Sequence, residues 1–67
     1  KMKLPFYVVE SEGLFFEYQD KDAAVDAFHE QKRFASYEGF YAELKEVFKT
    51  DKNAVGFNEQ TLMKYYT

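Results

Sequence analysis

The first 18 residues carry the pattern of two β-strands joined by a short turn. Residues 3–10 and 14–18 are rich in Phe, Tyr and Val, which favour strands. Gly13 lies between the two segments and can adopt the positive φ that a tight turn requires. The pattern therefore predicts a β-hairpin that turns at Ser11, Glu12 and Gly13.

The length of the turn sets the register that we expect for this hairpin. A three-residue loop places Glu10 opposite Leu14. One face is then entirely apolar and consists of Leu4, Phe6, Val8, Leu14, Phe16 and Tyr18. The outer face is mostly apolar too, and its expected cross-strand pairs are Val9 with Phe15 and Tyr7 with Glu17.

Residues 21–35 are expected to form the first helix. Asp20 is a favourable N-cap, and Asp22 lies in the first turn, where the helix dipole favours acidic side chains. Lys32 and Arg33 lie near the other end, where the dipole favours basic side chains. These signals predict both ends of the helix.

Two further helices are expected in the second half of the chain. After the candidate cap Ser36, six apolar residues follow helical spacing over about 120° of arc, which is typical of a helix with one buried side. They are Tyr37, Phe40, Tyr41, Leu44, Val47 and Phe48. A polar loop at residues 50–56 precedes Asn58, the candidate cap of a short C-terminal helix. The apolar side of that helix consists of Leu62, Tyr65 and Tyr66.

The order of these elements predicts the fold class. We expect an α+β arrangement, β-β-α-α-α, in which the N-terminal hairpin packs on two amphipathic helices and a short third helix follows. Residues 1–67 are expected to form one small globular domain. Phe and Tyr make up 21% of the chain, and their rings supply the core volume that so short a domain otherwise lacks.

The absence of cysteine and of long apolar stretches excludes several classes of protein. Without Cys, the chain has no disulfide framework, no thiolate zinc site and no cysteine nucleophile. The chain contains no run of about 18 apolar residues, the length needed to cross a membrane, and we expect no membrane partner. A chain without cysteine fits a reducing compartment, so we expect a cytoplasmic location. Lys1 precedes Met2, which indicates either that Met2 is the initiator or that the chain is a fragment of a longer protein.

The residues that could perform chemistry do not form a recognisable site. His29 is the only imidazole, and although Asp26 and Glu30 neighbour it, a transition-metal site needs three or four converging ligands. The two serines lie outside any nucleophile-elbow motif, and the three glycines are too scattered for a phosphate-binding loop. We therefore expect no enzymatic activity, no cofactor and no catalytic, cofactor-binding or metal-binding residue.

A DNA-binding regulator is the alternative function that the sequence suggests. The last two expected helices, with Gly56 between them, could form a degenerate helix-turn-helix. However, Lys52 stands where that motif expects a small residue, and the net charge of the chain is −3. The nine basic residues are spread along the chain, whereas binding to phosphates requires clustered Lys and Arg. These features argue against nucleic acid as a partner.

The outer face of the hairpin is the candidate partner-binding surface. Apolar and aromatic surface rimmed by acidic residues such as Glu10 and Glu12 is typical of an interaction site. The residues expected to bind the partner are Tyr7, Val9, Phe15 and Glu17. We expect a small non-enzymatic protein-binding module, such as an adaptor, inhibitor or regulatory subunit, whose partner is another protein or a second copy of the chain. A helix folded over this face would remove it from contact, and the sequence leaves that alternative open.

Overall fold

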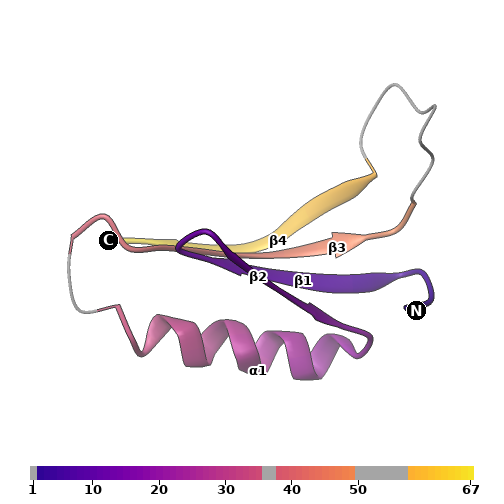
Figure 1. Cartoon of the computed structure of the whole chain (residues 1–67), viewed down its shortest axis with the longest axis horizontal. Helices are drawn as coiled ribbons and strands as arrows, with labels where there is room; N and C mark the ends of the chain where they lie inside the picture. The colour runs from indigo at the N-terminus through magenta and orange to yellow at the C-terminus, as the bar shows by residue number, and fades with distance from the viewer. Residues whose placement is uncertain (1, 36–37, 50–57) are drawn as a thin grey trace.

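The computed structural model of the chain is one antiparallel sheet with a helix on one of its faces (Figure 1). It describes residues 2–35, 38–49 and 58–67. The elements in chain order are β1 (Phe6–Ser11), β2 (Leu14–Tyr18), α1 (Lys21–Lys32), β3 (Tyr41–Val47) and β4 (Glu59–Tyr66). The four strands lie in the order β2-β1-β3-β4, so β1 and β3 are central and β2 and β4 are the edges.

The expected hairpin is present, but its register differs by one residue. The turn has two residues, Glu12 and Gly13, so that Ser11 lies opposite Leu14 and Val9 lies opposite Phe16. The expected pairing of Val9 with Phe15 is therefore wrong. Because successive side chains of a strand point to opposite faces, this shift exchanges the β2 residues that accompany each face of β1.

Glu12 adopts a left-handed conformation in the shorter turn. Both turn residues have positive φ, 50° at Glu12 and 84° at Gly13, as a type I′ turn requires. A non-glycine residue adopts this conformation only at a cost. Two hydrogen bonds to Tyr41, at the start of β3, hold Glu12 there: its carboxylate accepts from the Tyr41 N–H (3.1 Å), and its own N–H donates to the Tyr41 carbonyl (3.3 Å).

The first expected helix is confirmed as α1. The Asp20 side chain accepts a hydrogen bond from the Ala23 N–H at 3.1 Å, which satisfies one of the free donors of the first turn. The helix ends at Lys32, three residues before the expected end at Ala35. Ala24 and Phe28 are its buried residues and face the sheet.

The second and third expected helices are wrong, and with them the β-β-α-α-α arrangement. Of the described residues, 41–47 form β3 and 59–66 form β4, so the fold is mostly sheet with a single helix. β3 pairs with both β1 and β4, and these long-range pairings override the local helical spacing of the apolar residues. The expected cap Ser36, the stripe residue Tyr37 and the polar loop at residues 50–56 lie outside the described residues.

The core lies between α1 and the sheet face that it covers. Val9 and Leu44, which pair across β1 and β3, are fully buried there. Phe28 packs from the helix, and Phe40 closes the core just before β3. The opposite face of the sheet takes no part in this core.

Candidate protein-binding surface

The sheet face opposite α1 is here named the open face. In the described part of the chain no helix lies over it, since α1 packs against β1, β2 and β3 from the other side (Figure 1). All four strands contribute side chains to it. β1 and β2 supply Phe6, Val8, Glu10, Phe15 and Glu17. β3 and β4 supply Tyr41, Glu43, Lys45, Glu59, Thr61, Lys64 and Tyr66, together with Val47.

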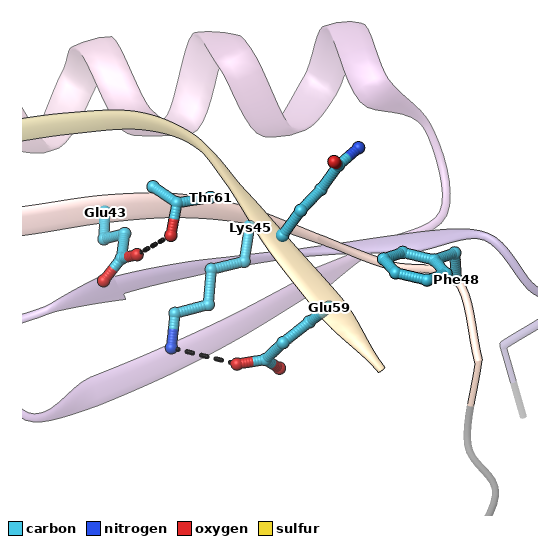
Figure 2. Close-up of a pocket in the computed structure, with 6 residues that line it drawn as sticks. Glu43, Lys45, Phe48, Glu59 and Thr61 are labelled. Carbon is cyan, nitrogen blue, oxygen red and sulfur yellow. Dashed lines mark hydrogen bonds and ion pairs between the residues drawn. The ribbon is translucent and has the colours of Figure 1, made fainter. Parts of the chain in front are cut away.

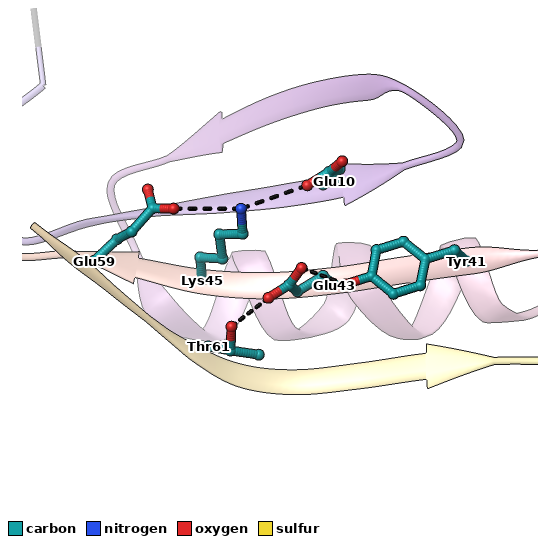
Figure 3. A network of polar contacts seen from close by, with 6 residues as sticks. All are labelled: Glu10, Tyr41, Glu43, Lys45, Glu59 and Thr61. Atoms are coloured by element: carbon teal, nitrogen blue, oxygen red, sulfur yellow. Dashed lines mark hydrogen bonds and ion pairs between the residues drawn. The ribbon is translucent and has the colours of Figure 1, made fainter. Parts of the chain in front are cut away.

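Lys45 is the central cation of the open face. Its ammonium group lies 3.5 Å from the Glu10 carboxylate on β1 and 3.3 Å from the Glu59 carboxylate on β4 (Figure 3). Burial lowers the pKa of Lys45, but the hydrogen bond to Glu59 and the charges of Glu59, Glu43 and Glu10 together raise it above the ordinary value. A catalytic lysine base needs a lowered pKa. Lys45 instead connects β3 to β1 and β4 through these two ion pairs.

Glu43 is a buried carboxylate beside Lys45, with 7% of its surface exposed. It accepts hydrogen bonds from the hydroxyl groups of Tyr41 and Thr61 (Figure 3). Burial alone would raise the pKa of Glu43, but these two hydrogen bonds, with the charges of nearby lysines, lower it below the ordinary value. The hydrogen bond from Tyr41 to Glu43 also raises the pKa of Tyr41 to about 12. Glu43 is thus held ionised, whereas a general acid needs a raised pKa.

A shallow hollow of about 500 Å³ lies at one end of the open face (Figure 2). Its lining residues are Glu43, Lys45, Phe48, Glu59, Gln60 and Thr61. The charged groups in the hollow are engaged with one another or with Thr61. Within residues 2–35, 38–49 and 58–67 no group of three or more His, Asp or Glu side chains could hold a metal ion. The described lining of the hollow therefore offers no ready set of metal ligands.

The structure divides the four residues expected to bind a partner. Phe15 and Glu17 lie on the open face, and 62% of Phe15 is exposed. Tyr7 and Val9 lie on the opposite face beneath α1, where they belong to the core. The hydroxyl group of Tyr7 also donates a hydrogen bond to Glu46 at 3.2 Å. The one-residue shift of the hairpin register accounts for this division, and partner binding by Phe15 and Glu17 stays a prediction.

Three aromatic residues of the open face were expected elsewhere: Phe6 on the inner face of the hairpin, and Tyr41 and Tyr66 on the buried sides of two helices. Tyr41 and Tyr66 are cross-strand neighbours with ring centroids 6.4 Å apart, and 72% of Tyr66 is exposed. The alternation of apolar Ala42 and Leu44 with charged Glu43 and Lys45 is the signal that could have indicated a strand.

His29 lies on the exposed side of α1, outside the open face. Its ring packs edge-on against Phe28 with centroids 5.7 Å apart. We expect His29→Ala to change the free energy of unfolding by about 0.5 kcal/mol or less, as is usual for exposed positions, and to leave partner binding unchanged. Thermal melts and binding titrations would measure both. Lost binding in a variant with an unchanged circular dichroism spectrum would contradict this expectation.

The helix-turn-helix alternative loses its structural basis. It required helices where the described residues form β3 and β4.

Among the described residues, no helix is long and apolar enough to cross a membrane. Comparison of the chain with family models, curated proteins and solved structures gave no match.

Proposed function

We propose that the chain is a non-enzymatic protein-binding module whose open face binds a segment of another protein that is both basic and partly apolar. The observation that carries the proposal is the exposure of Phe15 (62%) and Tyr66 (72%) on a face that no helix of the described chain covers. Exposed aromatic surface of this kind marks interaction sites, and aromatic residues are enriched in binding hot spots.

The charge of the open face supports a basic partner. The described strands place four carboxylates on this face and two cations, Lys45 and Lys64. The carboxylates are those of Glu10, Glu17, Glu43 and Glu59. Charge complementarity steers association and selects among partners. An Arg or Lys side chain of the partner could also stack on Tyr41 or Tyr66, because cations are attracted to aromatic rings.

The protonation states of Glu43 and Lys45 support a binding role over a catalytic one. Glu43 has a lowered pKa and Lys45 a raised one, so both groups keep their ordinary charges at neutral pH. Catalytic acids and bases instead have pKa values moved toward neutrality.

The proposal includes a cytoplasmic location, which the cysteine-free composition favours.

Selection from a peptide library displayed on phage, with the chain immobilised, tests the proposal. We expect the selected peptides to combine Lys or Arg with a neighbouring aromatic or aliphatic residue. Calorimetry with a selected peptide should show that Phe15→Ser and Tyr66→Ser each weaken binding at least about tenfold, or about 1.4 kcal/mol. Added salt should weaken binding as well, because it screens exposed charges.

Phe34→Ser is the matched control for this experiment. Phe34 lies beyond the end of α1 and is 62% exposed, the same fraction as Phe15. Its replacement should leave peptide binding unchanged. Selection of acidic peptides, or of peptides whose affinity survives both open-face substitutions, would refute the proposal.

A further inference from the structure

The edge strand β2 lacks the features that protect natural edge strands from pairing with another chain. Leu14 and Phe15 are each 62% exposed, and Phe16 is 38% exposed. Glu17 is the only charged residue of the strand, and its pairing with β1 is regular from Leu14 to Tyr18, without a bulge or a proline. Natural edges are usually blunted by lysines, prolines or bulges, because unpaired backbone groups attract further strands.

The other edge of the sheet, β4, carries such protection. Its pairing with β3 shifts between Leu44 and Lys45, where Leu62 is the extra residue of a bulge. Glu59 and Lys64 place charges of both signs along the strand. The two edges therefore differ in kind, and β2 is the one open to a further strand.

The outward backbone groups of β2 belong to Phe15 and Glu17. The N–H of Glu12 donates to the carbonyl of Tyr41, so Glu12 directs its backbone toward β3. Backbone direction alternates along a strand, and Ser11 therefore directs its backbone toward β2 and its partner Leu14. By the same alternation the backbone groups of Phe16 point toward β1. Those of Phe15 and Glu17 point away from β1, at the edge of the described sheet.

We propose that β2 pairs with β2 of a second copy of this chain, antiparallel and centred on Phe16. This register is the one in which all five residues of the strand are paired. Phe16 then lies opposite Phe16 of the second copy, and Leu14 lies opposite Tyr18. Phe15 of each copy, a residue with outward backbone groups, then lies opposite Glu17 of the other copy. These two pairs, one on each side of the two-fold axis, form backbone hydrogen bonds.

The side chains of β2 fit this self-pairing. The register keeps the two Glu17 carboxylates from facing each other, and like charges directly opposite are destabilising. On the face that α1 shares, it places the exposed Phe16 rings side by side and covers Leu14 with an aromatic neighbour. Two four-stranded sheets thereby become one continuous sheet of eight strands. The contact between the two Phe16 rings lies on the face that α1 shares, whereas the paired Phe15 and Glu17 side chains lie on the open face.

Sedimentation of the intact chain and of charged variants tests the pairing. The wild type should associate reversibly to twice its mass of 8.0 kDa. Phe16→Lys and Phe16→Glu should each raise the dissociation constant more than tenfold, because like charges then meet at the two-fold axis. A mixture of the two variants should recover the dimer, since Lys then faces Glu. Glu17→Pro, which removes an outward N–H, should give a monomer as well.

Met63→Lys is the matched control, since Met63 is 36% exposed on the opposite edge strand. It should leave the dimer unchanged. A wild type that stays at 8.0 kDa at its highest soluble concentration would overturn the proposal. So would a Phe16→Lys and Phe16→Glu mixture that stays monomeric, or a folded Glu17→Pro variant that still dimerises. Peptide binding at the open face should survive Phe16→Lys, so each proposal can fail without the other.

Discussion

Leu44→Ala is expected to lower the free energy of unfolding by about 2–5 kcal/mol, the range typical of truncating a fully buried leucine. Leu44 has no exposed surface and lies on the central strand β3, opposite Val9 of β1 and beneath α1. Its truncation removes apolar contacts and leaves a cavity that the paired strands cannot close. Since a domain of this size has marginal stability, the variant should be largely unfolded at room temperature.

Thermal and urea melts followed by circular dichroism would measure this effect. Leu14→Ala is the matched control, because Leu14 is 62% exposed on the edge strand β2. At low protein concentration, where any dimer dissociates, its melting curve should stay close to that of the wild type. A Leu44→Ala variant that melts within a degree or two of the wild type would show that Leu44 is not part of the core.

Glu43→Gln is expected to destabilise the protein at neutral pH by about 1–3 kcal/mol, the cost of disturbing buried hydrogen bonds to a charged group. The Glu43 carboxylate accepts from the hydroxyl groups of both Tyr41 and Thr61. A glutamine offers one oxygen, and its amide group places a donor where an acceptor is needed.

The pH dependence follows from the lowered pKa of Glu43. A carboxyl group whose pKa is lower in the folded state stabilises the fold above its unfolded value, here 4.5, and this contribution is lost as the pH falls through the folded value. The difference in urea midpoint between the wild type and Glu43→Gln should therefore be largest near pH 7 and shrink toward about pH 3. Exposed Glu30 on α1 supplies the control, and Glu30→Gln should shift the midpoint little at either pH. A gap between wild type and Glu43→Gln that is independent of pH would contradict the assignment.

The elements that could be predicted from the sequence are those stabilised by neighbouring residues. Asp20 caps α1 through a residue three positions away, and Gly13 marks the turn of the hairpin. β3 could not be predicted in this way. Its apolar residues fit helical spacing as well as alternation, and what decides between them is pairing with β1 and β4, which are distant in the chain.

The candidate surface was predictable only in part, for the same reason. Phe15 and Glu17 were correctly expected to share a face, because they lie two residues apart on one strand. Which residues of β1 accompany them depends on the register, and this depends on the conformation of Glu12. The aromatic pair of Tyr41 and Tyr66 belongs to the surface only through the pairing of β3 with β4.

The left-handed conformation of Glu12 links the hairpin turn to the arrival of a third strand during folding. An isolated segment with β1 and β2 alone would hold Glu12 at positive φ without its two hydrogen bonds to Tyr41. These two hydrogen bonds exist only when β3 has docked. The native register of the hairpin and the docking of β3 are therefore mutually dependent, and they should form in one cooperative step rather than in sequence.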